Sequence, residues 1–184
     1  TKLLYNAKNK LQTALKISAF GNLIDFATLE HSDLTKEIAT FNKFKIRFRR
    51  FGEFSKKLSE SKIILIVGDN AGEIVFDKIL IEFLTSKYKN IKIYFAVKSG
   101  PVINDATIGD AEYTGLDKVC QVIESGLKIP GIALDRCSKV FLKVFNSADL
   151  ILSKGQGNFE SLSSVNDDRI YYLLKIKCDV VAKH

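Results

Sequence analysis

An apolar run that is followed directly by a glycine-flanked polar turn limits the possible folds of this chain more than any other feature. Residues 63–67, IILIV, are continuously apolar and mostly β-branched, which is typical of a strand inside a parallel sheet covered on both faces. The run leads directly into residues 68–73, GDNAGE. Apolar residues then recur at helical spacing, with Glu73 and Asp77 in the first turns, where the helix dipole favours negative charge. The sequence therefore predicts a strand, a tight turn and a helix N-terminus, the junction at which open α/β sheets bind ligands.

The chain length and the spacing of the cysteines limit the kinds of protein that this chain can be. A chain of 184 residues suits one domain with a sizeable core. Cys120, Cys137 and Cys178 are widely spaced, so we expect no disulfide framework, a cytoplasmic location and small buried thiols. No signal peptide opens the chain, and no apolar stretch approaches the ~18 residues of a membrane span. Because the chain starts at Thr1 and has no methionine, we expect a fragment, a processed product or a trimmed chain.

The net charge of +7 is compatible with a polyanionic partner, but a lysine-rich surface is the favoured interpretation. Basic and aromatic residues interleave in residues 43–51, KFKIRFRRF, as they do in some nucleic-acid platforms. We interpret this segment as an amphipathic connector with inward rings and solvated cations. Nucleic acid and membranes are therefore not expected as partners, and the sequence carries no signature of an oligomeric state.

Two regions follow from the periodicity. A first amphipathic helix is predicted from Leu4 to Ser18, ending near Gly21 as its C-cap, and short helices and loops follow to residue 54. From residue 55 onward strands and helices alternate, which predicts an α/β, Rossmann-like three-layer domain with a mainly parallel sheet. We thus expect a small helical segment over residues 1–54, a cap or companion that is truncated at its N-terminus, and the α/β domain over residues 55–184.

The predicted elements of the second region are short. Strands are expected at residues 62–67, 91–97, 119–123 and 149–153, and helices at residues 72–86 and 134–145. The second helix has a possible break at Ser138, and residues 170–175 fit either a strand or a helix.

Polar clusters follow three of these strands. Asp69 and Asn70 follow the first, Lys98, Asn104, Asp105 and Thr107 follow the second, and the lysine-glycine segment Lys154, Gly155, Gln156, Gly157 and Asn158 follows the strand at residues 149–153. Because the C-terminal ends of parallel strands share one edge of a sheet, we expect the clusters to meet there. Each cluster alone also fits a purely structural role as a turn or helix cap, and the helix terminus already explains Glu73.

The residue types of these clusters indicate phosphate chemistry. Asp69, Asn70 and Asp105 offer two carboxylates and an amide with no histidine or thiolate nearby, an all-oxygen set suited to Mg²⁺ or Mn²⁺. Lys154 lies beside glycine-rich backbone, which can supply charge and N–H groups to a phosphate. The sequence therefore predicts a metal ion that bridges a phosphoryl group, whose neutralisation is the main lever of phosphoryl transfer.

The same residues lie in segments that closely resemble the metal-dependent damage-control phosphatases, also catalogued as domain of unknown function 89. The matching segments span most of the chain in order: residues 21–25 (GNLID), 68–77 (GDNAGEIVFD), 101–107 (PVINDAT), 115–117 (GLD) and 148–160 (ADLILSKGQGNFE). The pattern is similar to that of the stand-alone archaeal and bacterial branch.

The resemblance implies a Rossmann-like α/β domain with a helical companion and a divalent metal ion, Mn²⁺, Mg²⁺, Co²⁺ or Ni²⁺. It implies hydrolysis of phosphate monoesters of small metabolites, including sugar phosphates and nucleotide-like compounds. The family's metal ligands carry over to Asp69, Asn70 and Asp105, and its phosphate-facing lysine carries over to Lys154. Further candidate contacts of the phosphate or substrate are Glu73, Asn104, Gly155, Gly157 and Asn158.

One departure from the family concerns the ends of the chain. Family members usually have a longer N-terminal helical region, with a cysteine pair in this branch, and continue past the lysine-cysteine segment that ends this chain. Part of the substrate cap could therefore lie outside these 184 residues.

Two alternatives stay open at this point. A methyltransferase that binds S-adenosylmethionine also places a glycine-containing acidic turn after a strand, but Gly68 and Gly72 bracket Asp69 and Asn70 instead of forming a glycine-rich loop. The other alternative is a basic, non-enzymatic nucleic-acid-binding module built on residues 43–51. Within the phosphatase interpretation, attack on phosphorus by Asp69 and attack by a metal-bound water are both compatible with these residues.

Overall fold

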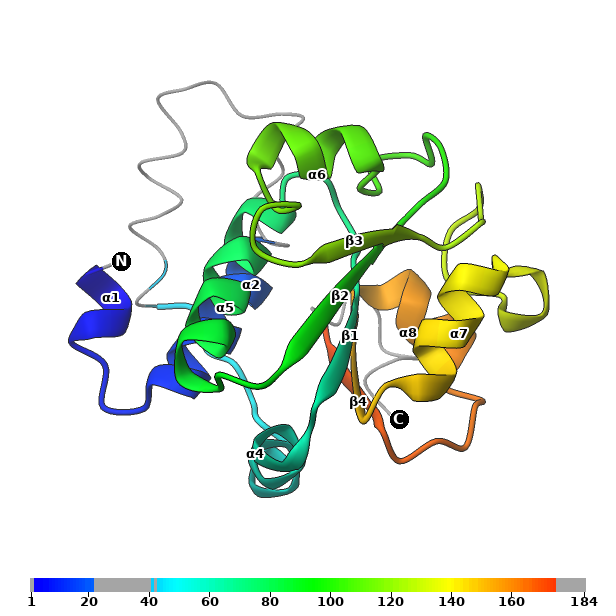
Figure 1. The fold of residues 1–184 in the computed structure, drawn as a ribbon. Coiled ribbons are helices and arrows are strands. Elements are labelled where there is room, and N and C mark those ends of the chain that lie inside the picture. Colours follow the sequence, from blue (N-terminus) through cyan, green and yellow to red (C-terminus); the bar gives the residue numbers. More distant parts are fainter. Residues whose placement is uncertain (1, 22–40, 42, 175–184) are drawn as a thin grey trace.

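The computed structural model describes residues 2–21, 41 and 43–174, and within them a five-stranded parallel sheet carries helices on both faces (Figure 1). The strands are β1 (Ile63–Val67), β2 (Lys92–Val97), β3 (Gln121–Glu124), β4 (Leu150–Lys154) and β5 (Ile170–Leu173). Their order across the sheet is β3-β2-β1-β4-β5, and every neighbouring pair is parallel. The expected α/β, Rossmann-like fold is confirmed.

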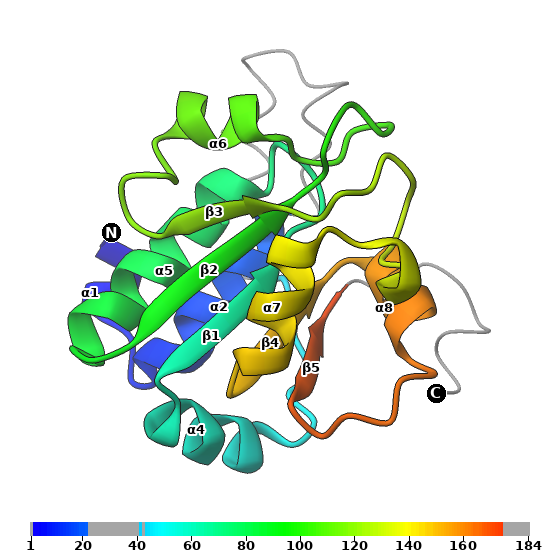
Figure 2. The ribbon, with the colours of Figure 1, turned by 45° about the vertical axis from the view of Figure 1, so that its right-hand side comes forward.

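The helices form the two outer layers. On one face lie α5 (Ile74–Lys87) and α6 (Ile108–Thr114), which connect β1 to β2 and β2 to β3. On the other face lie α7 (Lys139–Ser147), preceded by the 3₁₀ helix η1 (Leu134–Arg136), and α8 (Gln156–Leu162), as Figure 2 shows. The chain leaves β1 toward β2 and β3 and then returns to place β4 on the other side of β1. The strand order thus reverses between β1 and β4, the position at which open α/β sheets bind ligands.

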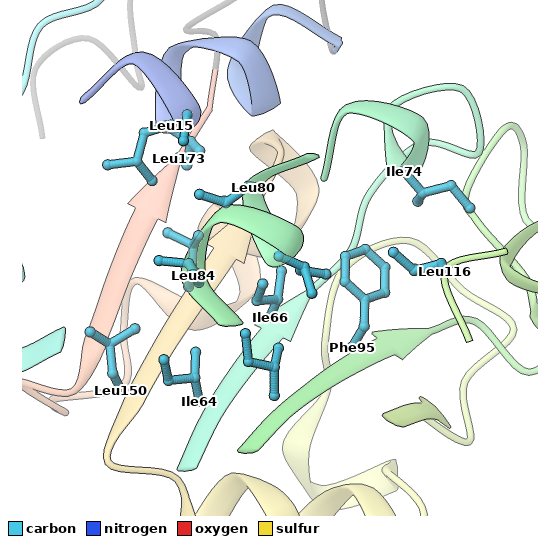
Figure 3. Packing of buried hydrophobic residues seen from close by; sticks show 14 of the residues in the cluster. Leu15, Ile64, Ile66, Ile74, Leu80, Leu84, Phe95, Leu116, Leu150 and Leu173 are labelled. Carbon is cyan, nitrogen blue, oxygen red and sulfur yellow. The ribbon is translucent and has the colours of Figure 1, made fainter. Parts of the chain in front are cut away.

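Strand β1 is buried from both sides, which explains its continuous apolar sequence. Successive side chains of a strand point to opposite faces. Ile64 and Ile66 pack into one core with α5, whereas Leu65 and Val67 pack into a second core with α7 and α8. Figure 3 shows Ile64 and Ile66 on the side of the sheet that Leu80 of α5 covers. Each such buried side chain stabilises the fold by roughly 1.5–3 kcal/mol.

The N-terminal residues form two helices, so the expectation of one continuous helix from Leu4 is wrong. Helix α1 (Lys2–Tyr5) ends early, and α2 (Lys10–Gly21) begins after a break. The break follows from a capping interaction, since the Gln12 backbone N–H donates to Asn9 Oδ1 at 3.0 Å and asparagine is a preferred N-cap residue.

Helix α2 packs beside α5 and contributes to the core of the sheet (Figure 1). Leu11, Ala14 and Leu15 of α2 are buried in the same cluster as Ile64 and Ile66 of β1. Helix α4 (Phe51–Glu60) spans residue 54. The division of the chain at that residue stays a prediction, and within the described part of the chain α2 shares the hydrophobic core with the sheet.

The basic segment before α4 has the expected alternation. The cations that precede Arg50, namely Lys43, Lys45, Arg47 and Arg49, are exposed. The apolar residues between them, Phe44, Ile46 and Phe48, are partly buried and pack against the main core. The segment is therefore an amphipathic connector whose aromatic rings are used in packing.

The structure also tests several smaller predictions. The predicted break at Ser138 is confirmed, because Ser138 caps α7 and its Oγ accepts from the Phe141 N–H at 3.1 Å. Residues 170–173 form strand β5 rather than a helix. Cys120 and Cys137 are free thiols and are partly buried, so the expectation of buried thiols is met only in part.

Some predictions fall outside the described residues. They concern residues 22–25 of the GNLID segment, the loops expected up to residue 40, Cys178 and the lysine-cysteine segment near the end of the chain. Among the helices that are described, none is long and apolar enough to span a membrane.

Candidate active site at the edge of the sheet

Backbone hydrogen bonds tie the loop after β1 to the loop after β2 and bring the predicted metal ligands together. Asn70 and Asp105 form an isolated antiparallel bridge. The Ala106 N–H donates to the Asp69 carbonyl at 2.8 Å, next to that bridge. Both loops follow the C-terminal ends of parallel strands, as the sequence predicted. Asp69, Asn70 and Asp105 are all half-buried, so their side chains are held by the fold while part of each stays accessible.

Gly155, the single residue between β4 and α8, packs directly on Asp69. Gly155 has a φ of 78°, and a Cβ atom built on it would lie 2.1 Å from Asp69 Cγ. Asn158 fixes this approach, because its Nδ2 donates to the Gly68 carbonyl at 2.9 Å and to the Lys154 carbonyl at 2.8 Å. The absence of a side chain at residue 155 is therefore what allows the loops after β1 and β4 to meet.

Lys154 ends β4 with its ammonium group completely buried between two carboxylates of α5. Lys154 Nζ lies 2.7 Å from Asp77 Oδ1, forms a second ion pair with Glu73, and lies 3.5 Å from the Ser18 carbonyl of α2. Burial lowers the pKa of Lys154, but the charges of Asp77 and Glu73 more than reverse this effect, so the pKa is raised and the ammonium stays charged. A contact of Lys154 with phosphate stays a prediction, since in this arrangement the ammonium faces two carboxylates and a carbonyl.

Glu73 is also fully buried and takes part in that ion pair, so the structure places it beneath the loops. Burial raises the pKa of Glu73 to about 7, an effect that the charge of Lys154 opposes and that of Asp77 reinforces. Its predicted contact with substrate stays untested.

A second buried lysine lies beside Asp105. Lys98 Nζ is 3.6 Å from Asp105 Oδ2 and donates to the Gly131 carbonyl, and the Lys98 side chain is 4% exposed. Burial lowers the pKa of Lys98, and Asp105 opposes this shift. Burial also raises the pKa of Asp105, with Lys98 opposing and the charge of Asp69 reinforcing the change. The pKa of Asp105 is therefore affected both by the ammonium of Lys98 and by the carboxylate of Asp69.

The remaining predicted residues have different environments. The Asn104 side chain is exposed, while its carbonyl accepts from the Ala71 N–H at 2.8 Å. Thr107 caps α6 in a reciprocal arrangement with Asp110, which confirms the capping interpretation. Gly157 is half-buried in the first turn of α8.

The donor set at Asp69, Asn70 and Asp105 fits a divalent cation with oxygen ligands. Within residues 2–21, 41 and 43–174, no three histidine, cysteine or acidic side chains are grouped so that they could hold a metal ion. Two carboxylates that repel one another, with an amide beside them, would leave most of the coordination shell to water or to a ligand. Mg²⁺ and Mn²⁺ accept such a shell, whereas sites with all ligands from the protein suit other ions.

Sequence reasoning missed the residues that surround Lys154. Asp77 was explained by the dipole of its helix, and Ser18 was assigned only to a helical repeat. The signal for Asp77 was its position, because an acid four residues after Glu73 falls on the buried face of α5 among Ile74, Leu80 and Leu84. No sequence signal pointed to Ser18, which lies 136 residues from Lys154.

The Gly155→Ala variant is expected to lose metal affinity by roughly 10- to 100-fold, a typical cost of disturbing the support of a metal ligand. The new methyl group would collide with the Asp69 carboxylate, and the φ of 78° is unfavourable for alanine. Calorimetric titration with Mn²⁺ measures the change. Gly157→Ala is the matched control, because a Cβ there would lie 3.5 Å from its nearest neighbour, Gly131 N. Equal Mn²⁺ affinity in both variants would show that Gly155 does not support Asp69.

Ile103 adopts a φ of 51° in the turn that precedes Asp105, and its side chain is 91% exposed. The Asp105 N–H donates to the Val102 carbonyl at 2.8 Å, so Ile103 is the first central residue of a tight turn, where positive φ favours glycine. Left-handed backbone costs isoleucine about 1–2 kcal/mol, and glycine costs about 0.5–1 kcal/mol in chain entropy.

Ile103→Gly is therefore expected to raise the free energy of unfolding by about 0.5–1 kcal/mol in urea denaturation. Ile103→Val keeps a β-branched side chain at this φ and serves as the control, with stability near that of the parent. A glycine variant less stable than the valine variant would contradict the assignment of strain.

Comparison with known proteins places this arrangement in a family. The model of the damage-control phosphatase ARMT1-like domain matches residues 1–184. The damage-control phosphatase PH1575 of Pyrococcus horikoshii is 42% identical over 177 residues, which cover 96% of this chain and 61% of that protein. A damage-control phosphatase of Archaeoglobus fulgidus is 32% identical over 186 residues, which cover 99% of this chain and 64% of the relative.

The fold agrees with these matches. The crystal structure of PH1575, described as a DUF89 family protein, superimposes with a TM-score of 0.87 at 41% identity and covers 97% of this chain and 63% of that one. The chain thus spans about three fifths of the length of the relatives it matches. The match extends over all 184 residues, and the chain therefore belongs to the family of ARMT1-like damage-control phosphatase domains.

Proposed function

We propose that this chain carries the metal- and phosphate-binding part of a phosphatase that hydrolyses phosphate monoesters of small metabolites. The observation that carries the proposal is the meeting of three loops at the switch point of the sheet. The bridge between Asn70 and Asp105 joins two of them, and Gly155 packs the third against Asp69. Two archaeal relatives are named damage-control phosphatases, which supports the same activity here.

In this proposal, Asp69, Asn70 and Asp105 would hold one divalent ion, Mn²⁺, Mg²⁺, Co²⁺ or Ni²⁺. When bound, the ion would supply positive charge that neutralises the phosphoryl oxygens. Asp69 and Asp105 are held by backbone hydrogen bonds of their loops, so the ligands need little reorganisation. Lys98 lies 3.6 Å from Asp105 Oδ2 and would fix the orientation of that carboxylate.

The substrate phosphate would face Gly155 and the first turn of α8, because Gly155 lies against Asp69. We propose that Gly155, Gly157 and Asn158 line the phosphate site and that Lys154 stabilises the transferring phosphoryl group. The buried ammonium shares its charge with Glu73 and Asp77, so we assign it to the floor of the site at the end of β4. Sugar phosphates and nucleotide-like phosphates are the proposed substrate classes.

We also propose a cytoplasmic location. The free thiols of Cys120 and Cys137 are compatible with a reducing compartment.

A screen of phosphate release tests the proposal. The purified protein is treated with a chelator and incubated with a panel of sugar phosphates, nucleotides and p-nitrophenyl phosphate. Each reaction is run without metal and with Mn²⁺, Co²⁺, Ni²⁺ or Mg²⁺. We expect release of inorganic phosphate only where a divalent ion is present. Absence of hydrolysis with every metal would contradict the proposal, and equal hydrolysis in the presence of the chelator would contradict its metal dependence.

A further inference from the structure

A buried cluster of charged and polar side chains lies beneath the proposed phosphate site and joins three elements. Lys154 comes from β4, Glu73 and Asp77 come from the start of α5, and Ser18 comes from α2. All four residues are 0% exposed. Asp77 Oδ1 accepts hydrogen bonds from both Lys154 Nζ, at 2.7 Å, and Ser18 Oγ. Asp77 therefore connects the side chains of α2 and of the end of β4, in addition to the contact at 3.5 Å between Lys154 Nζ and the Ser18 carbonyl.

The cluster is a costly way to hold these elements together. Removing charges from water costs several kcal/mol per ion, and apolar residues of similar volume are often as stable. Burial raises the pKa of Glu73 to about 7 although Lys154 opposes the shift, so one ammonium does not fully compensate the burial of two carboxyl groups. Moreover, Asp77 Oδ2 is buried and has no hydrogen-bond partner among the residues that the structure describes, a rare and unfavourable state for such an atom. Packing alone gives no reason for an acid at this position of an otherwise apolar helix face.

Lys154 is connected to the proposed metal ligand Asp69 through its neighbours Gly155 and Asn158. Gly155 follows Lys154 directly and lies against the Asp69 carboxylate. Asn158 Nδ2 donates to the Lys154 carbonyl at 2.8 Å and to the Gly68 carbonyl at 2.9 Å. A shift of the Lys154 side chain would thus disturb the loop that packs on Asp69. Because Asp77 holds Lys154 on one side and Ser18 on the other, it can set where this loop lies.

We propose that Asp77 is a positioning residue of the phosphate site: it fixes Lys154, Gly155 and the first turn of α8, and through the Ser18 hydroxyl it makes helix α2 part of the site. This inference rests on the proposed phosphatase function. It assigns to the N-terminal helix a role in phosphate binding, in addition to covering the sheet. Asp77 itself touches neither the phosphate nor the metal ion, and it acts through Lys154.

The Asp77→Asn variant tests the proposal because it keeps the shape of the side chain and removes its charge. Steady-state kinetics with p-nitrophenyl phosphate at saturating Mn²⁺ give kcat and KM, and inhibition by inorganic phosphate gives Ki. We expect kcat to fall by about 10- to 100-fold and the Ki of phosphate to rise by about tenfold, as for loss of a preorganised electrostatic contact. The affinity for Mn²⁺, measured by calorimetry, should fall by less than kcat does, because Asp69, Asn70 and Asp105 are all retained.

Two further variants separate positioning from folding. Glu82→Gln removes an exposed acid from the same helix and should leave all four quantities unchanged. Ser18→Ala keeps the pair of Asp77 and Lys154, and it keeps the backbone carbonyl of residue 18 that lies 3.5 Å from Lys154 Nζ. It deletes only the hydrogen bond from the Ser18 hydroxyl to Asp77, and we expect a rise of about threefold in the Ki of phosphate. Asp77→Glu restores the charge and should recover more activity than Asp77→Asn.

The outcomes distinguish this inference from the proposed function. A lower melting temperature of Asp77→Asn with unchanged kcat, KM and Ki would overturn the positioning role. If Asp77→Asn does not fold, an unchanged Ki in Ser18→Ala overturns the link that Asp77 makes to α2 through the Ser18 hydroxyl. If the parent protein releases no phosphate from any ester, the phosphatase proposal fails, whereas binding of inorganic phosphate by calorimetry still tests the role of Asp77 in a phosphate site.

Discussion

Replacing Asp69 with asparagine is expected to remove metal-dependent phosphate release, with a loss in kcat of at least about 10²- to 10³-fold. The substitution keeps the size of the side chain but deletes one of the two negative charges at the proposed metal site. The backbone of the loop should keep its place, because the hydrogen bond from Ala106 N–H uses the Asp69 carbonyl. Asp105→Asn should have a similar effect, since Asp105 supplies the other carboxylate.

Calorimetric titration with Mn²⁺ and phosphate release from an active substrate measure both changes. The matched control is Asp168→Asn, which removes one exposed carboxylate between α8 and β5. The control should bind Mn²⁺ and turn over as the parent does. If Asp69→Asn and Asp105→Asn bind Mn²⁺ as tightly as the parent, the metal site is assigned to the wrong residues.

Replacing Lys154 with alanine is expected to damage both the fold and the reaction. Without the ammonium, Glu73 and Asp77 would stay buried with no counter-charge, and breaking a buried ion pair in this way typically costs 3–5 kcal/mol. Loss of the charge at the phosphate site should lower kcat by about 10²-fold. The affinity for Mn²⁺ should barely move, because the proposed metal ligands are all retained.

The two effects can be separated with a charge-neutral variant. Lys154→Met combined with Glu73→Gln and Asp77→Asn leaves no buried charge in the cluster, so urea denaturation should show a higher free energy of unfolding than for Lys154→Ala. Its kcat should nevertheless stay low, because the positive charge is still absent. Lys118→Ala removes an exposed lysine and serves as the control. If Lys154→Ala is fully active while Asp69→Asn is inactive, the assignment of the metal site is retained and the phosphate role of Lys154 is overturned.

Local patterns were sufficient to predict a mainly parallel sheet that is covered on both faces, although not the order of its strands. A run as apolar as residues 63–67 is stable in water only when helices cover both faces, and the structure divides its side chains between two cores. The three polar clusters could also be placed at one edge, because parallel strands end on the same side. Ser138 could be recognised as a helix start because a cap depends on neighbours three residues away.

The continuity of the N-terminal helix and the burial of the cysteines were predicted less well. The periodicity of Leu4 to Ser18 fits one helix, but Asn9 starts a new one by accepting from the Gln12 N–H. Cys120 and Cys137 are apolar enough for the interior, yet the structure leaves both partly exposed. At Asn9 a single side-chain hydrogen bond thus outweighed the average helical preference of the segment.

The sequence by itself determined the strand-turn-helix unit around Asp69 and the edge at which the polar clusters gather, because periodicity and chain direction are local properties. Only the tertiary structure decided which side chains meet there. It inserted β4 beside β1, which put Gly155 against Asp69. It also packed α2 on α5, which joined Ser18, Asp77 and Lys154 in one buried cluster. These contacts link residues up to 136 positions apart, and their geometry depends on how whole layers pack, which no pattern within a single segment encodes.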